Sequence, residues 1–319
     1  MAKLHFLKSV TDTINTSFIL ESGDTLLMVD GGFPSETPYL YEYLKGLGGH
    51  VTAWFITHFH DDHMGALWTL LREHPDIQVD GVYCHLPSDE FLIHHAPKQD
   101  EYTTEELLTG LRGEMAKRGT PEVVVQTGED YAFDGGAVNV HIIHTPDETL
   151  VRNPINDSSI VFRFEADGKR ILFLGDLGPE GGVQLLEDVD HAELKADFVQ
   201  MAHHGQGCVN RDCYAAIQPT YCLWPTPSWL WDNMGPGGYD TGIFGTVVTR
   251  GWISSLRCVK RHYLMTKGTQ VIDLTEACHD RFVDRSGSPR FSGRSRIGGF
   301  LRLLPHHAVF QAQTDIGRG

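Results

Sequence analysis

The chain has 319 residues, of which 41% are hydrophobic and 21% are charged, a composition typical of a globular protein that buries a core. Its net charge of −16 excludes a general nucleic-acid surface, because a phosphate backbone attracts an excess of Lys and Arg. Charge interrupts the apolar residues at the start, and no stretch is long enough to span a bilayer. We therefore expect a cytoplasmic protein without membrane contact, with free cysteine thiols.

The first half of the chain alternates short apolar runs with segments of helical periodicity. Residues 17–20 and 25–29 predict a β-hairpin that ends at Asp30. Helical spacing of Leu and Tyr follows over 36–47, and the apolar run 53–57 predicts a buried strand. The further expected elements are a helix at 64–73, a strand at 81–84, a helix at 103–117, and strands at 123–126 and 138–144.

The second half continues this alternation, which favours an α/β fold. Strands are expected at 159–165 and 170–174 around a turn, and another at 197–201 before a pair of histidines. Residues 224–242 are rich in Pro, Gly and Trp, and they predict one long loop. Because long loops in compact domains are usually functional, we expect this loop to cover the site.

Four side chains that can bind metals occur within six residues, directly after the strand at 53–57. They are His58, His60, Asp62 and His63. In an extended segment residues two apart point the same way, so His58 and His60 can bind one ion while Asp62 and His63 reach a second. A lone histidine is usually an ordinary surface or core residue, but four ligands at this spacing predict a metal site.

Two later strands end in the same manner. The sequence Leu174-Gly175-Asp176 presents one carboxylate, which could bridge two cations about 3.5–4 Å apart. Residues 199–202 lead into His203 and His204, either of which could be a ligand. Because three strand ends present ligands at one place, we expect two metal ions. Zinc is the expected metal, and iron or manganese are the alternatives.

The order of these motifs resembles that of the metallo-β-lactamase superfamily. The resemblance runs from about residue 17 to residue 274 and rests on Asp30, the His58-x-His60-x-Asp62-His63 cluster, Gly175-Asp176 and the late histidine. It implies a four-layer αβ/βα sandwich and a hydrolase. Asp30 is then expected to accept a hydrogen bond that orients the metal-binding loop, and not to bind metal itself.

Other stretches narrow the resemblance to one branch. The motifs Asn156-Asp157-Ser158-Ser159, Ala202-His203-His204-Gly205 and Lys267-Gly268-Thr269 are similar to the lactamase-like domain of competence DNA-uptake proteins and to related phosphodiesterases. Many superfamily members also have a metal-binding histidine in Gly-His-Thr-Pro, where this chain has Ile143-His144-Thr145-Pro146. His144 is therefore a candidate ligand, although the competence-like branch often lacks it.

The resemblance implies hydrolysis of a phosphodiester by metal-bound hydroxide. Asp62 could also orient the attacking water, and the histidine of the late pair that does not bind metal could protonate the leaving group; we expect His203 to bind metal and His204 to be catalytic. The alternative is a lactone, ester or thioester hydrolase, in which Trp229 and Trp231 would contact an apolar acyl group. A non-catalytic metal-binding scaffold is a third hypothesis, and the complete set of ligands argues against it.

The hydrolase domain is expected to cover residues 1–280, followed by a basic extension at 281–319. Only Asp284 and Asp315 oppose the arginines of this extension. The arginines are Arg281, Arg285, Arg290, Arg294, Arg296, Arg302 and Arg318. A solvated polar tail is the simpler interpretation, and a docking arm for a partner or substrate is the alternative.

Overall fold

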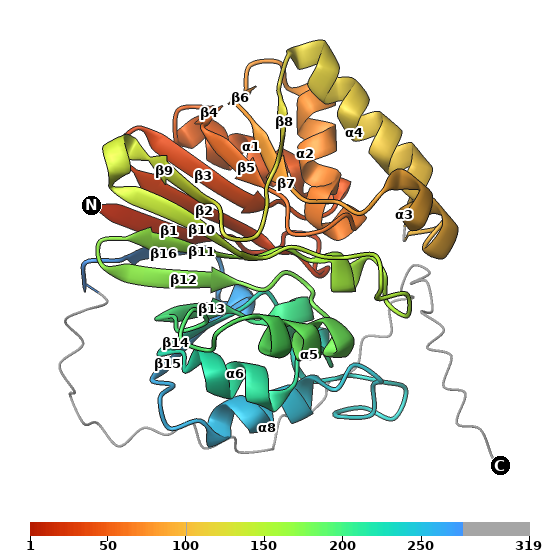
Figure 1. The fold of residues 1–319 in the computed structure, drawn as a ribbon, viewed down its shortest axis with the longest axis vertical. Coiled ribbons are helices and arrows are strands. Elements are labelled where there is room, and N and C mark those ends of the chain that lie inside the picture. Colours follow the sequence, from red (N-terminus) through yellow and green to blue (C-terminus); the bar gives the residue numbers. More distant parts are fainter. Residues whose placement is uncertain (100, 277–319) are drawn as a thin grey trace, which may run out of the picture. The chain divides into compact units, whose positions relative to one another are not determined.

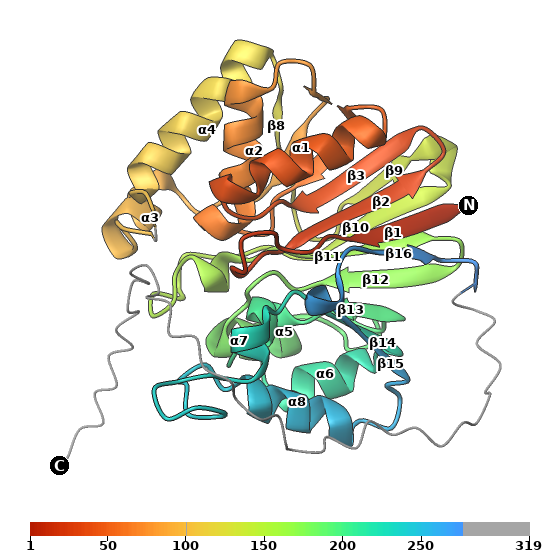
Figure 2. The same cartoon turned by 180° about the vertical axis from the view of Figure 1, so that it is seen from behind.

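The computed structural model describes residues 1–99 and 101–276. Within them, two seven-stranded sheets pack face to face, and helices cover the outer face of each sheet (Figure 1 and Figure 2). The predicted four-layer αβ/βα sandwich is thus confirmed. The expected domain boundary at residue 280 and the basic extension at 281–319 lie outside the described residues.

The first sheet has the strand order β16-β1-β2-β3-β5-β7-β8. Its strands are β1 (Ala2–Phe6), β2 (Ser17–Ser22), β3 (Thr25–Asp30), β5 (Ala53–Phe55), β7 (Val82–Cys84), β8 (Glu122–Val124) and β16 (Gln270–Asp273). Strands β3, β5, β7 and β8 are parallel. Because the carboxyl ends of parallel strands lie at one edge, Asp30 at the end of β3 is placed beside the segment that follows β5.

The second sheet has the order β15-β14-β13-β12-β11-β10-β9. Its strands are β9 (Asp130–Phe133), β10 (Val138–His144), β11 (Val161–Ala166), β12 (Lys169–Phe173), β13 (Phe198–Gln200), β14 (Tyr221–Trp224) and β15 (Arg261–Leu264). Strands β12 to β15 are parallel. The segments that follow β12, β13 and β14 therefore meet at one edge of this sheet.

Helices connect the parallel strands and form the outer layers. The α-helices are α1 (Thr37–Gly46), α2 (Asp61–Glu73), α3 (Asp89–His95), α4 (Thr104–Arg118), α5 (Pro179–Asp188), α6 (Arg211–Ile217), α7 (Ser228–Trp231) and α8 (Thr246–Ser255). The shorter elements are β4 (His50–Val51), β6 (Gln78–Val79), η1 (Pro34–Glu36), η2 (Asp134–Gly136), η3 (Asn156–Ser158), η4 (Ala202–Gly205) and η5 (Met265–Lys267). None of the described helices is long and apolar enough to cross a membrane.

Three apolar layers hold the sandwich together. The middle layer lies between the sheets and includes Phe55 and Phe162, whose rings stack at 5.2 Å. Neighbouring residues on a strand point to opposite faces, so Trp54 packs instead in the layer under α1, α2 and α4. The third layer lies under α5, α6 and α8. Continuous apolar runs such as 53–56 are thus explained by strands that are buried on both faces.

Most predicted elements are present, but α3, α5, α8 and β9 were not predicted. Strand β1 was not predicted either, although its sequence alternates apolar and polar residues, a pattern typical of a strand. Helix α2 begins at Asp61 and not at residue 64, so two candidate ligands lie in its first turn. The prediction of one long loop at 224–242 is wrong in part, because α7 interrupts it.

Candidate metal centre

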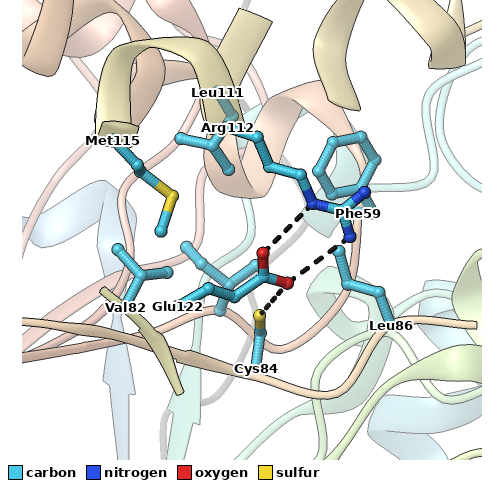
Figure 3. A pocket seen from close by; sticks show the side chains of 9 residues that line it. Phe59, Val82, Cys84, Leu86, Leu111, Arg112, Met115 and Glu122 are labelled. Carbon is cyan, nitrogen blue, oxygen red and sulfur yellow. Dashed lines mark hydrogen bonds and ion pairs between the residues drawn. The ribbon is translucent and has the colours of Figure 1, made fainter. Parts of the chain in front are cut away.

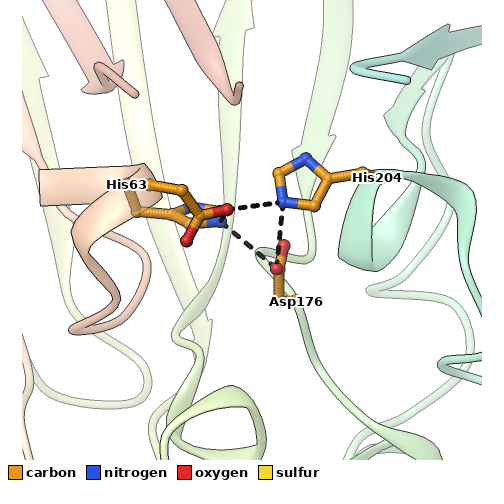
Figure 4. A group of neighbouring side chains, drawn as sticks. His63, Asp176 and His204 are labelled. Atoms are coloured by element: carbon orange, nitrogen blue, oxygen red, sulfur yellow. Dashed lines mark hydrogen bonds and ion pairs between the residues drawn. The ribbon is translucent and has the colours of Figure 1, made fainter. Parts of the chain in front are cut away.

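Four buried side chains from three chain segments converge where the parallel strands of both sheets end. Asp62 and His63 come from α2, Asp176 follows β12, and His204 lies in η4 (Figure 4). One potential ligand atom from each lies within 4.8 Å of all the others. Three of the sequence motifs are therefore brought together in space.

The first segment changes from strand to helix within the histidine cluster. His60 is extended and precedes α2, whose first turn carries Asp61 and Asp62. Acidic side chains stabilise the positive end of a helix, so the cluster also suits helix initiation. His58 and His60 are close to each other, with His58 Nε2 3.0 Å from His60 Nδ1. His58 Nε2 also lies 3.9 Å from Asp176 Oδ2, so this pair adjoins the four central residues.

Asp30 and Thr57 orient the rings of the first segment. Asp30 Oδ2 lies 2.8 Å from His63 Nδ1 and accepts a hydrogen bond from the Thr57 hydroxyl, while Asp30 Oδ1 accepts one from Thr57 N. Thr57 Oγ1 is also 3.1 Å from His58 Nδ1. These contacts leave His63 Nε2 facing the centre, 3.2 Å from Asp176 Oδ2. The orienting role expected for Asp30 fits this geometry, and Thr57 is an additional support that the sequence analysis missed.

The second segment presents a single carboxylate on a tight turn. Gly175 has a φ of 55°, and a side chain there would meet Ser159 Oγ at 2.6 Å. The Ser159 hydroxyl accepts a hydrogen bond from Asp176 N at 2.9 Å. Glycine is thus required both by the left-handed backbone and by the close approach of η3 and β11. The result is a buried Asp176 carboxylate, 3.2 Å from the Nε2 atoms of His63 and His204.

The third segment carries both late histidines in an unusual backbone conformation. His203 and His204 have φ values of 50° and 53°, a region that non-glycine residues rarely adopt. His204 Nδ1 lies 3.2 Å from Pro225 O and 3.3 Å from Thr16 Oγ1. Its Nε2 atom therefore faces inward, 3.0 Å from Asp62 Oδ2. His203 lies farther out, with Nε2 3.9 Å from Asp176 Oδ2.

Burial and the two carboxylates set the charge states of the cluster. Burial lowers the pKa of His60 to about 4 and also lowers the pKa of His58 and His203, which leaves neutral rings near pH 7. Burial opposes charge on His204 as well, but the carboxylates of Asp176 and Asp62 outweigh it and raise its pKa to about 9. Burial disfavours charge on Asp176, yet the nearby imidazoles hold its pKa well below the usual range. The cluster thus combines ionised carboxylates with neutral rings at His58, His60 and His203, whereas at His63 and His204 burial is outweighed by the carboxylates, which raise the pKa of both rings and favour their protonated forms.

The residues present fit a metal centre. His63 Nε2, Asp176 Oδ1 and His203 Nδ1 are buried and have no hydrogen-bond partner. Such atoms are costly to bury, and a cation can bind a ring nitrogen or carboxylate oxygen that no donor satisfies. Imidazole nitrogen and carboxylate oxygen are usual zinc ligands. The oriented rings and the free lone pairs therefore match what a bound ion needs.

His144 occupies a different environment from the cluster. It is the last residue of β10, is buried, and its Nε2 has no hydrogen-bond partner. Burial lowers its pKa, and the charges that act on it are those of Asp188 and Asp147. Asp188 ends α5. The charges that influence His144 thus come from Asp147 and Asp188 and not from the carboxylates of the cluster.

The two tryptophans expected to bind substrate have different surroundings. Trp231 packs edge-to-face on the buried Trp224 at 5.0 Å, and the Arg250 guanidinium lies 4.1 Å from the ring centre. Trp229 is half-buried and donates a hydrogen bond from Nε1 to Asp12 O at 3.0 Å. Trp231 therefore supports the third apolar layer, whereas Trp229 connects its loop to the segment before β2.

A small cavity lies beside the metal-binding segment, between α4 and the first sheet (Figure 3). Apolar side chains, including Phe59 and Met115, form most of its lining. Its polar groups bond to one another: Arg112 Nε donates to Glu122 at 3.1 Å, and Cys84 Sγ lies 3.6 Å from the same carboxylate. The cluster residues do not line this cavity, so we interpret it as a packing feature.

Comparison with known proteins agrees with this fold. A family model described as Metallo-beta-lactamase superfamily matches residues 10–206, more than half of the chain. The chain is similar to the metallo-beta-lactamase fold protein YhfI from Bacillus subtilis, with 12% identity, a TM-score of 0.50, and coverage of 86% of this chain and 100% of that one. It is also similar to Igni18, a metallo hydrolase from the archaeon Ignicoccus hospitalis, with 12% identity, a TM-score of 0.49, and coverage of 86% and 99%. No curated protein matches the chain by sequence.

Proposed function

The chain belongs to the metallo-beta-lactamase superfamily and is a hydrolase with a buried His/Asp metal-binding cluster, and on this basis we propose that it cleaves a phosphodiester with two metal ions. One observation carries the proposal: Asp176 Oδ2 lies between two groups of imidazoles, 3.2 Å from those of His63 and His204 and 3.9 Å from those of His58 and His203. A carboxylate in this place can bridge two cations.

We assign the ligands to two groups that share Asp176. His58, His60 and His203 would hold the first ion, and Asp62, His63 and His204 the second. His204 is assigned as a ligand and not as a proton donor, because Nδ1 faces Pro225 O and Nε2 faces the carboxylates, which leaves no ring nitrogen for the substrate. His144 is left out of both groups, since the carboxylates whose charge influences its pKa are Asp147 and Asp188 and not Asp62 or Asp176. Zinc suits these ligands best, with iron or manganese as alternatives.

The two ions supply, when bound, water ionised near neutral pH and positive charge beside the oxygens of the transition state. Asp62 Oδ2 lies 3.0 Å from His204 Nε2, so both side chains can face the same ion, and the Asp62 carboxylate can also accept a proton of the attacking water. His60 and His203 are the partly exposed members of the cluster, so substrate would approach along these two rings. Trp229, on the loop that follows Pro225, is the side chain that we propose for substrate contact.

A phosphodiester is favoured because its phosphoryl group is negatively charged, and the two ions held by the cluster would supply the positive charge that binds it. A β-lactam also needs its carboxylate recognised, usually by Lys or Arg. Arg211, the only cation between residues 200 and 233, donates instead to Ser255 Oγ on α8. The similarity of the Asn156-to-Ser159 and Ala202-to-Gly205 motifs to competence-like phosphodiesterases supports the same choice. The second candidate substrate is an ester or lactone. It is favoured by three exposed apolar side chains between α7 and α8, which are Met234, Tyr239 and Ile243.

The substrate class can be tested on one zinc-loaded sample. We expect a higher kcat/KM for bis(p-nitrophenyl) phosphate than for a chromogenic cephalosporin or an aromatic lactone. Asp62→Ala should abolish the activity, and this variant controls for contaminating enzymes. Rapid lactone turnover without phosphodiesterase activity would move the assignment to the second candidate. Elemental analysis of the same sample should give two metal ions per chain.

A further inference from the structure

We propose that Gln200 is a positioning residue, which holds the turn carrying Asp176 and the turn carrying His203 and His204 at the separation that a two-metal site needs. The inference rests on the proposed function, because it concerns the geometry of the same ligands. Gln200 does not touch the reacting atoms, and it would act only through the backbone on which the ligands stand.

The Gln200 carboxamide bonds to both ligand turns. Its Oε1 accepts a hydrogen bond from Leu174 N at 2.9 Å, and its Nε2 donates to Gly175 O at 3.0 Å and to Met201 O at 2.8 Å. Leu174 and Gly175 immediately precede Asp176, while Met201 immediately precedes η4. The side chain is fully buried. One amide group therefore connects the segment before the bridging carboxylate to the segment before the late histidines.

These bonds begin where the β-ladder ends. Strands β12 and β13 pair in parallel at Ile171 with Phe198 and at Leu172 with Val199. The pairing between β12 and β13 ends there, although Gln200 still pairs with Leu223 of β14 and Phe173 with Phe162 of β11. The buried backbone groups on the facing sides of the two segments therefore need other partners. The side chain of Gln200 supplies them, so it continues the connection between β12 and β13 up to the ligands.

Gly175 O is the point at which the two turns meet. It accepts hydrogen bonds from Gln200 Nε2 at 3.0 Å and from His203 N at 3.1 Å. His203 and His204 both have positive φ, and such a conformation persists only where the surroundings enforce it. The Thr226 hydroxyl holds the far side of the turn through His204 O at 2.6 Å. Gln200 holds the near side, so the strained turn is clamped from both directions.

The three partners of Gln200 require one acceptor and two donors. A primary amide offers both kinds of atom on one rigid plane. An ionised glutamate has the same shape but offers only acceptors, so it would keep the bond from Leu174 N and place a charged oxygen against Gly175 O and Met201 O. Gln200→Glu is therefore a shape-conserving test of the two donated bonds.

Gln270 provides a matched control. Its Nε2 also donates to two backbone carbonyls, Leu264 O at 2.8 Å and Gly268 O at 3.4 Å. It lies in β16 at the edge of the first sheet and is partly buried. Gln270→Glu breaks comparable bonds in an element that carries none of the proposed ligands. It thus measures how a general loss of stability affects metal binding.

The experiment titrates the natural protein and both variants with cobalt(II) and records the visible spectrum and the thermal midpoint. We expect Gln200→Glu to weaken binding of at least one cobalt ion by about 10–100-fold, as for other residues that orient ligands, and to change the cobalt absorption bands. Gln270→Glu should lower the thermal midpoint yet bind cobalt with the natural affinity and spectrum. Natural affinity and spectrum in Gln200→Glu would overturn the inference.

The outcomes separate this inference from the proposed function. If the natural protein binds no cobalt, the proposed two-metal function fails, and the inference fails with it. If the natural protein binds two ions and Gln200→Glu binds them equally well, only the inference fails. If Gln200→Glu does not fold, the inference can be tested instead by amide hydrogen exchange of the natural metal-free protein, which measures how firmly Gln200 Oε1 holds Leu174 N–H. We expect Leu174 N–H to exchange as slowly as Val199 N–H within the ladder, and exchange at the rate of an exposed loop would overturn the inference.

Discussion

The two ligand-bearing regions of the sandwich hold their side chains by different means. In the first, residues 57–63, other side chains orient the rings: Asp30 and Thr57 contact the Nδ1 atoms of His63 and His58. In the second, residues 174–176 and 201–206, most of the supports bond to the main chain of the region, as the Thr226 hydroxyl does at His204 O. The first region also presents its proposed ligands from the short segment between β5 and α2 and from the first turn of α2, whereas the second uses consecutive positive φ angles.

This difference shows that the positions of the proposed ligands depend on side-chain contacts to the rings in the first region and on the backbone conformation in the second. Side-chain support can be removed by one substitution that leaves the fold unchanged. A backbone conformation depends on the positions of whole segments. It is therefore stabilised by hydrogen bonds to the main chain, such as the one that the Thr226 hydroxyl donates to His204 O. We therefore expect substitutions of the supporting residues of the first region to change metal binding selectively, and substitutions of the supporting residues of the second to change metal binding and local stability together.

Among substitutions that keep the size of the side chain, Asp176→Asn should have the largest effect, because Asp176 is the proposed ligand that both regions share. Losing the bridging charge removes the anion that lies 3.2 Å from both His63 and His204. Changes at residues that merely orient a ligand cost about 10–100-fold in activity, so we expect a loss of more than about a hundredfold in kcat/KM. The thermal midpoint of the metal-free protein should change little. Equal losses of activity and metal-free stability would show that Asp176 is mainly structural.

Asp30→Asn should have the next largest effect and should act on the first region alone. The amide keeps the shape of Asp30 but lacks the charge, and one of its two positions would become a donor facing Thr57 or His63. We expect metal affinity to fall by about 10–100-fold, measured by competition with a chelator. Ser22→Ala, which removes the hydrogen bond to Asp134 at the opposite end of β2, is the control. The same affinity in Asp30→Asn and the natural protein would contradict an orienting role.

Much of the first region could be predicted from the sequence, because it is local. Four ligands within six residues after an apolar strand define the site without knowledge of the fold. The role expected for Asp30 came from the family resemblance, and the parallel pairing of β3 with β5 accounts for it. The pairing of these two strands brings residues 30 and 57 together at one sheet edge.

The second region could be predicted only in part. Asp176 and the pair His203 and His204 follow strand ends and were predicted as site residues, with His203 expected to bind metal and His204 to be catalytic, but their supports are distant in sequence. Thr16 contacts His204 across 188 residues, and no local pattern indicates such a contact. The proposal that His144 binds metal came from a four-residue motif, and a motif does not define which face of β10 the ring occupies. Likewise, no local sequence pattern indicates that Trp231 packs on Trp224.

Thr226→Val should have a moderate effect and should act on the second region. It removes the hydroxyl that donates to His204 O at 2.6 Å, and leaving this carbonyl without its donor should cost about 1–3 kcal/mol of unfolding free energy. Because the turn is strained, metal affinity should fall with it. Thr120→Val is the matched control, since Thr120 also donates from a buried hydroxyl to a carbonyl, Val79 O at 3.2 Å. A comparable loss of metal affinity in both variants would show that the effect is general destabilisation.

Trp229→Phe should have the smallest effect, and it tests whether the stretch 224–242 covers the site. The substitution keeps an aromatic ring but removes the Nε1 donor that bonds Asp12 O. Asp12 precedes Thr16, which contacts His204, so this bond joins the loop to the segment beside the second region. One neutral hydrogen bond contributes about 0.5–1.5 kcal/mol, which corresponds to a rise in KM of a few-fold with kcat unchanged.

Trp231→Phe is the control against which the small effect of Trp229→Phe on KM can be judged. Trp231 packs on Trp224 and Arg250, so a smaller ring should lower the thermal midpoint without changing KM. If the loop covers the site, the two variants separate, one affecting KM and the other stability. If both variants change only stability, the loop is a packing element, and substrate recognition must be sought along the partly exposed rings of His60 and His203.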